Sequence, residues 1–137
     1  MSDFKPELST DNPYHIGRHR YYELKHFCLQ YPEWKKQIKM LEPPLTVEFI
    51  ERFQRASELP NPTERIAIMR SSLEECCLQV ERAALATDQE LSRWILAGVT
   101  EGRNYENLDT TMGIPCSRDT YYDRYRKFFW ILSKSRT

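Results

Sequence analysis

The sequence predicts an all-α fold, and three observations lead to that prediction. Apolar residues recur at alternating steps of three and four in several segments, which is the periodicity of an amphipathic helix. Residues that start or stop helices separate those segments, and no segment alternates apolar and polar residues for long enough to form a strand. The 137 residues are enough for one domain with its own core. We therefore expect a small helical bundle with a C-terminal helix-turn-helix.

The N-terminal residues 1–13 are polar, contain two prolines and show no periodicity, so we expect a flexible arm there. They carry no basic stretch followed by an apolar one, which argues against a secretory signal. No apolar run in the sequence approaches the roughly 20 residues that a membrane helix needs. These features predict a cytoplasmic protein of a bacterial host that has no membrane partner.

The N-terminal helical segment is expected over residues 14–60. Its first helix is indicated by one apolar stripe, which consists of Tyr21, Leu24, Cys28 and Tyr31, with Phe27 beside it. Pro32 interrupts a helix but begins one well, so a break and a new short helix are expected there. The apolar residues of that short helix are Trp34, Ile38 and Leu41. After a loop over residues 42–45, Thr46 is expected to cap a helix whose apolar side is Val47, Ile50 and Phe53.

The helical domain is expected over residues 61–137, and it opens with Asn61 as N-cap and Pro62 as first helical residue. A heptad seam follows, made of Ile66, Met69, Leu73, Cys76, Val80 and Ala83. A seam of this kind packs against another helix of the same chain or of a second copy. The sequence therefore leaves two alternatives open: intramolecular packing, or a homo-oligomer formed through the helix over 66–83.

The next helix is expected to start at Thr87, because Glu90 three residues later completes a capping-box pattern. Its apolar face consists of Leu91, Trp94, Ile95 and Val99. Gly102 is a typical residue at the end of a helix.

The helix-turn-helix is expected over residues 103–134. A short helix over 105–112 precedes Gly113, where the chain turns, and Pro115 prevents the helix from continuing. Ser117 is a good N-cap for a second helix. The inward face of that second helix consists of Tyr121, Tyr125, Phe128 and Leu132, at steps of four, three and four.

The second helix of such a unit can lie in the major groove of double-stranded DNA, and its composition fits that role. The net charge of the chain is zero, but residues 118–136 carry six Lys and Arg against two Asp. Side chains near the helix start reach base edges, and the basic residues that follow can neutralise phosphates. The predicted DNA-binding residues are Ser117, Arg118, Asp119, Thr120, Tyr122, Arg124, Arg126 and Lys127. An ordinary amphipathic helix with a solvated charged face is the alternative reading.

The stretch Ile-Pro-Cys-Ser-Arg-Asp-Thr-Tyr-Tyr-Asp-Arg-Tyr-Arg-Lys resembles the C-terminal motif of phage-encoded late-gene transcription regulators of the RinA and ArpU type. Those regulators resemble the DNA-binding region 4 of bacterial sigma factors. The resemblance covers about residues 87–134, roughly a third of the chain. The residues that carry it are Ile114, Pro115, Ser117, Arg118, Thr120, Tyr121, Tyr122, Arg124, Arg126 and Lys127. It implies a sequence-specific DNA-binding protein that acts with RNA polymerase.

Other chemistry is less well supported by the sequence. His15, His19, His26 and Cys28 lie near one another, but helix geometry does not bring them onto one face, so no metal site is expected. No phosphate-binding glycine loop and no hydrolase motif is present, so the sequence predicts neither an enzyme nor a cofactor. The four cysteines are expected to be free thiols.

Two further functions remain as alternatives to a phage or prophage transcription regulator. A small terminase subunit, which recognises DNA for packaging, also combines a helix-turn-helix with oligomerising helices. A helical protein-interaction module would not bind nucleic acid at all. The basic and aromatic stretch over residues 18–27 could stack on nucleic acid, but the same pattern is typical of an amphipathic helix with inward tyrosines, which we favour.

Overall fold

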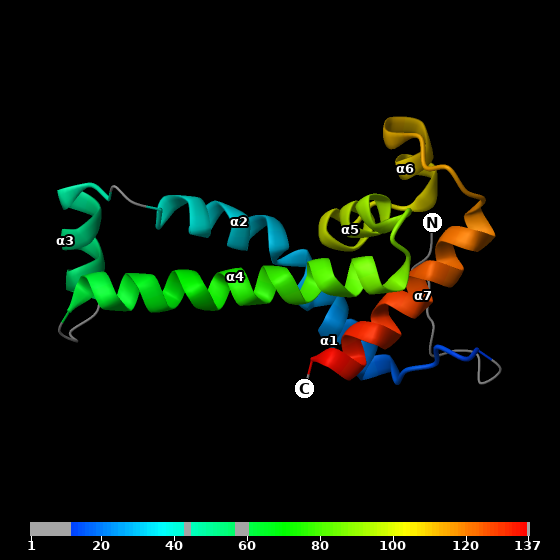
Figure 1. Ribbon diagram of the computed structural model, residues 1–137, viewed down its shortest axis with the longest axis horizontal. Coiled ribbons are helices and arrows are strands. Elements are labelled where there is room, and N and C mark those ends of the chain that lie inside the picture. Colours follow the sequence, from blue (N-terminus) through cyan, green and yellow to red (C-terminus); the bar gives the residue numbers. More distant parts are fainter. Residues whose placement is uncertain (1–11, 43–44, 57–60, 137) are drawn as a thin grey trace.

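The computed structural model describes residues 12–42, 45–56 and 61–136, and every regular element in those ranges is an α-helix (Figure 1). The prediction of an all-α fold is confirmed. Residues 1–11 of the predicted arm over 1–13 and residues 43–44 of the predicted loop over 42–45 lie outside the described residues. The helices are α1 (Arg18–Leu29), α2 (Tyr31–Met40), α3 (Val47–Ala56), α4 (Pro62–Thr87), α5 (Ser92–Glu101), α6 (Tyr105–Met112) and α7 (Arg118–Ser135).

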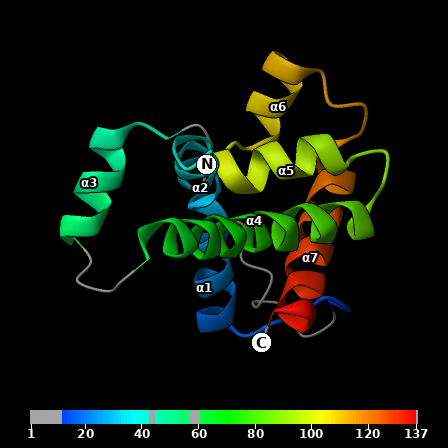
Figure 2. The same ribbon diagram turned by 60° about the vertical axis from the view of Figure 1, so that its left-hand side comes forward.

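The long helix α4 organises the molecule, because α2, α3, α5 and α7 pack on it, while α1 and α6 pack mainly on those helices (Figure 1). We call one group of elements the head: α1, α5, α6, α7 and residues 77–87 of α4. We call the other the stem: α2, α3 and residues 62–76 of α4. Figure 2 shows α3 at the free end of the stem, away from the helices of the head.

The break between α1 and α2 falls where proline predicts it. Pro32 lies in the first turn of α2, and the amide of Trp34 donates to the carbonyl of Gln30 over 3.0 Å. The predicted apolar stripe of α1 is buried, with Tyr21, Leu24 and Cys28 fully enclosed. The ring of Trp34 packs edge-on against Phe27, with 4.8 Å between the ring centroids. The two helices therefore enclose a shared apolar contact despite the break.

The two predicted caps of the stem are present in the structure. The side chain of Asn61 accepts a hydrogen bond from the amide of Glu64 over 3.2 Å, at the start of α4. The hydroxyl of Thr46 accepts one from the amide of Phe49 over 3.1 Å, at the start of α3. Both caps satisfy amides that have no partner within the first turn of a helix.

The predicted cap at Thr87 is wrong. The helix α4 runs through Thr87, whose buried hydroxyl donates to the carbonyl of Ala83 over 2.7 Å. Asp88 closes the turn before α5 instead, because its carboxylate accepts the amides of Glu90 and Leu91, each over 3.0 Å, and Leu91 directly precedes the helix without a side-chain cap. A threonine at the end of a helix can bond back to its own preceding turn, and the adjacent aspartate is then the residue with extended backbone geometry that a cap needs.

The predicted seam of α4 is enclosed along only part of its length. Val80 and Ala83 are buried in the head, and Ile66 is buried in the stem. Met69, in contrast, is 43% exposed, and the flanking Ile68 is 62% exposed. Residue Val47 of α3, predicted on an apolar side, is 70% exposed.

The predicted division between residues 14–60 and 61–137 does not separate two cores. Tyr21 and Leu24 of α1 belong to the same buried cluster as Val80 of α4, Ile95 of α5 and Phe129 of α7. The helix α1 therefore completes the head rather than forming a unit of its own. Within the described ranges, no helix is both long enough and apolar enough to cross a membrane.

Candidate nucleic-acid interface

The backbone between α6 and α7 follows the predicted order of helix, glycine turn and capped helix. Gly113 adopts φ 59°, a left-handed conformation that glycine adopts at low cost, and its amide closes α6 by donating to Asp109 over 3.1 Å. Ile114 is buried directly after it. The Ser117 side chain then accepts the amide of Thr120 over 3.2 Å. The first turn of α7 is therefore fixed by local bonds at its own start.

The inner face of α7 is aromatic and fully packed. Phe128, Phe129 and Leu132 have no exposed surface, and Tyr121 is 1% exposed. The ring of Phe129 packs edge-on against Tyr21, with 5.2 Å between centroids, and the hydroxyls of Tyr21 and Tyr125 lie 2.6 Å apart. These contacts hold the axis of α7 against α1 and α4, so only the opposite side of the helix is open to a ligand.

The structure brings seven of the eight predicted DNA-binding residues to the open side or its margins. Ser117, Arg118 and Asp119 are exposed, and the half-buried residues are Thr120, Arg124, Arg126 and Lys127. All of them lie in the first three turns of α7 or at its cap.

The eighth residue, Tyr122, is a correction. Its side chain is 5% exposed, and its hydroxyl accepts a hydrogen bond from the amide of Tyr105 over 3.3 Å. The ring also packs against Tyr121, with 5.1 Å between centroids. The inward face of α7 is wider than the predicted stripe, because two adjacent tyrosines are needed to fill the space between α6 and α1. Tyr122 is therefore a core residue and positions α6.

Arg118 is held at the start of α7 by an acid from the neighbouring helix. Its Nε lies 3.1 Å from a carboxylate oxygen of Glu106 on α6, and its guanidinium lies 5.0 Å from the centroid of the Tyr122 ring. Both charged side chains are more than half exposed, so the ion pair is weak in water and its partners are exchangeable. A phosphate or a base edge could take the place of Glu106.

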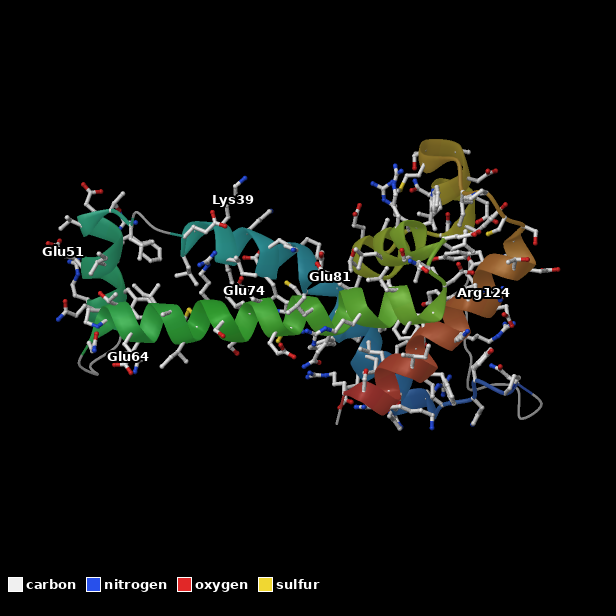
Figure 3. The ribbon with its side chains drawn as sticks, in the orientation of Figure 1. Lys39, Glu51, Glu64, Glu74, Glu81 and Arg124 are labelled. Atoms are coloured by element: carbon white, nitrogen blue, oxygen red, sulfur yellow. The ribbon has the colours of Figure 1, made fainter. Side chains whose placement is uncertain are left out.

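Arg124 forms two ion pairs near the point where α4 ends and α5 begins (Figure 3). Its Nε lies 2.9 Å from Asp88, and its second nitrogen lies 2.5 Å from Asp123. Burial raises the pKa of the Asp88 carboxyl, but the hydrogen bond from Arg124 and the two backbone amides outweigh it and leave that pKa below its ordinary value. The hydrogen bond that Arg124 donates to Asp88 raises the pKa of Arg124. Arg124 therefore joins α7 to the end of α4 through its ion pair with Asp88.

The electrostatic balance of the site is close to neutral. Residues 118–127 contain four basic side chains and two acidic ones. Asp123 also lies 3.9 Å from Arg126, and Glu106 and Asp88 supply two more carboxylates from outside the helix. Lys127 is the basic residue of this stretch for which the described residues offer no ion-pair partner. The arginines must exchange carboxylates for phosphates if the helix binds DNA.

Sequence reasoning missed Glu106 and the pairing role of Asp88. Glu106 is separated from Arg118 by a turn, and helical spacing rules do not extend across a turn, so no sequence signal pointed to this pair. Asp88 was passed over because Thr87 fitted a capping pattern. Trp130 and Lys134 were also missed as a pair on the outer face, where the Lys134 ammonium lies 4.6 Å from the ring centroid.

Nucleophilic and metal chemistry finds little support at this site. Burial raises the pKa of the Cys116 thiol, and Asp88 raises it further, so the reactive thiolate is disfavoured. Across the ranges that the structure describes, no three histidine, cysteine or acidic side chains are grouped closely enough to hold a metal ion. The hydroxyl of Tyr105 donates to the carbonyl of Cys116 over 2.6 Å, which marks the loop before α7 as a structural element.

No family model, curated protein or solved structure matches the chain. The resemblance to late-gene regulators of the RinA and ArpU type therefore stays a prediction from the sequence.

Proposed function

We propose that the chain binds double-stranded DNA in a sequence-specific way, with the start of α7 in the major groove. The observation that carries the proposal is the contrast along α7. Its inner face is locked into the head by aromatic packing, while Ser117, Arg118 and Asp119 are exposed directly after the glycine turn. A rigid helix that presents its first turn to solvent is the arrangement that major-groove readers use.

The proposed mechanism is an exchange of partners. Arg118 leaves Glu106 for a base edge, where a guanidinium can form two hydrogen bonds to guanine. Asp119 can accept from a cytosine amino group, and the Ser117 and Thr120 hydroxyls can bond to phosphate or base. Arg126 and Lys127, one turn or more further on, contact phosphates and add salt-dependent affinity. Arg124 keeps the helix in place and contributes to the local field.

In the cell, the proposed role is that of a phage or prophage transcription regulator that acts with bacterial RNA polymerase in the cytoplasm. The support for this finer role is the resemblance of residues 114–127 to the regulator motif. The outer residues of α7 beyond the DNA-binding turns, among them Trp130, are available for a protein contact.

The test begins with selection of bound duplexes from a random DNA library by the purified full chain. We expect one preferred sequence to emerge. Arg118→Ala should relax that preference, and Lys127→Ala should weaken binding to all duplexes and lower the salt slope by about one. Lys39→Ala, on an exposed lysine of the stem, is the matched control and should change neither (Figure 3). Failure of the library to yield any preferred duplex would overturn the proposal.

A small terminase subunit is the second candidate, and the exposed apolar residues of the stem are the observation that favours it. Such subunits assemble through helices next to their DNA-binding unit. A ring-sized assembly measured by light scattering would support packaging, whereas a monomer or dimer would support regulation.

A further inference from the structure

A groove lies between α3 and the first half of α4, in the stem. Its volume is about 400 Å³, and its lining residues are Phe53, Arg65, Ile68, Met69, Ser72 and Leu73. Except for Arg65 and Ser72, these side chains are apolar. Two of these apolar side chains are open to solvent, since Ile68 is 62% exposed and Met69 is 43% exposed.

The groove exists because α7 packs on the second half of α4 and does not reach the first half. The seam residues Val80 and Ala83 are buried in the head, where α7 packs against α4. The same stripe continues into the stem through Leu73 and Met69, at helical spacing, but α7 does not extend that far (Figure 1). In the stem, α2 and α3 pack on α4 instead, and they bury Ile66 but leave Met69 43% exposed, so the described helices cover this half of the seam only in part.

The groove is also lined by a basic side chain, Arg65, whose matching partner is an acidic residue. The Nε of Arg65 is buried and has no hydrogen-bond partner in the described part of the chain. A buried donor without a partner is costly, and a carboxylate is the acceptor that best matches a guanidinium. The occupant of the groove should therefore be an apolar surface with an acid beside it.

The outer face of α3 has that chemistry. Val47 is 70% exposed, and Glu51 lies four residues later on the same side of the helix. Glu48 is exposed beside them, and so are the bases Arg52 and Arg55. The charge pairing proposed for this face is therefore that of Glu51 alone. For Glu48 and Glu51, the described ranges contain no ion-pair partner. Figure 3 shows Glu51 at the free end of the stem, where a second molecule can reach it.

We propose that two copies of the chain pair through their stems, with α3 of each copy seated against the groove of the other. Val47 of one copy covers Met69 and Ile68 of the other, and Glu51 of one copy pairs with Arg65 of the other. Each contact occurs twice about a two-fold axis, as in most homodimers. The interface lies in the stem, and the start of α7 stays open in both copies.

The first experiment measures the mass of the full chain by sedimentation velocity over a range of concentrations. We expect the mass to rise from the monomer value of 16.4 kDa to twice that value. Met69→Glu should keep the chain monomeric at every concentration. Leu85→Glu is the matched control, because Leu85 is a 56% exposed apolar residue of α4 in the head, and this variant should dimerise normally.

The second experiment separates a specific contact from general stickiness or a folding defect. Arg65→Glu and Glu51→Arg should each be monomeric, because every pair in their homodimers joins like charges. An equimolar mixture of the two variants should form dimers again, since both pairs of the mixed dimer then join opposite charges. A wild-type chain that stays monomeric, a ring-sized assembly, or a mixture that does not recover dimers would each overturn the proposal.

Discussion

The head and the stem use the same helix in different ways. In the head, α5 and α7 pack on α4 and leave Val80 and Ala84 with almost no exposed surface, while Leu85, outside that face, is 56% exposed. In the stem, the same helix is covered by α2 and α3 alone, and Ile68 is 62% exposed. The comparison teaches that an apolar seam predicts where a helix makes contact, whereas the number of neighbouring helices decides whether the chain itself supplies that contact.

The two regions also differ in how their charges are arranged. In the head, Asp88 and Arg124 join the end of α4 to α7, and Glu106 and Arg118 join α6 to α7. In the stem, the buried nitrogen of Arg65 finds no acceptor in the described part of the chain. Ion pairs are therefore present in both regions, since Arg70 pairs with Glu42 in the stem, but the Arg65 nitrogen is a buried donor that the described residues leave unsatisfied.

The largest difference between the regions should appear when one phenylalanine is removed from each. Phe129→Ala should lower the free energy of unfolding by about 3–5 kcal/mol, because Phe129 is fully buried among aromatic rings of the head. Phe53→Ala, in the partly exposed wall of the groove, should cost less than about 2 kcal/mol. Urea unfolding monitored by circular dichroism measures both. Equal losses would mean that the stem is as tightly packed as the head.

The next effect concerns the contact between α5 and α7. A Cβ atom at Gly98 would collide with the Tyr121 hydroxyl, so Gly98→Ala should destabilise the chain by about 1–3 kcal/mol, although alanine is the better helix former. The hydroxyl of Tyr121 is buried and has no hydrogen-bond partner within the described ranges. Tyr121→Phe should therefore be close to neutral alone and should recover part of the loss in the double variant. Thermal unfolding of the four proteins in this cycle checks the coupling.

A third prediction tests the ion pair between Asp88 and Arg124. Asp88→Asn keeps a capping side chain but removes the charge that pairs with Arg124, so we expect a loss of about 1–2 kcal/mol at neutral pH. Because the folded-state pKa of Asp88 is lowered, its contribution is present above the ordinary carboxyl pKa and is lost as pH falls through the folded value. Urea unfolding at a series of acid pH values should show this loss in wild type and not in the variant. Asp119→Asn, on an exposed carboxylate, is the control.

Glu106→Gln is expected to have the smallest effect on stability but a measurable effect on affinity for the selected duplex. This change removes the exposed carboxylate that competes for Arg118 and should leave the unfolding transition unchanged. Affinity for the selected duplex should rise by about two- to fivefold at low salt. Glu74→Gln, which removes an exposed carboxylate from the stem, should not alter affinity (Figure 3). An unchanged affinity in the Glu106 variant would argue that Arg118 does not meet DNA.

Much of the head could be predicted from the sequence, because its signals are local. Gly102 and Gly113 both adopt the left-handed conformation expected at helix ends, and Ser117 caps α7 as its residue type predicts. The inward residues Phe128 and Leu132 followed from helical spacing. Where two local signals competed, as at Thr87 and Asp88, the sequence alone could not tell which hydroxyl or carboxylate would reach the amides.

The rest depends on contacts between residues far apart in the chain. Tyr122 fits an outward position of a narrow stripe, and only the placement of α6 across its hydroxyl shows that it is buried. The pairing of Arg118 with Glu106 spans the turn between two helices, where no fixed spacing applies. Likewise, the seam of α4 is apolar in both halves, and only the placement of α2 and α3 shows that Ile66 is buried in the stem while Met69 is 43% exposed.

The unbroken course of α4 has a geometric consequence. With 26 residues at about 1.5 Å each, it is a stiff rod of roughly 39 Å that holds the proposed DNA-reading turn, at the start of α7, at a set distance from α3. If two molecules join end to end at α3, their reading turns point to opposite ends of the assembly. Their separation then exceeds one turn of B-form duplex, about 34 Å, and an operator would need two inverted half-sites spaced at least that widely.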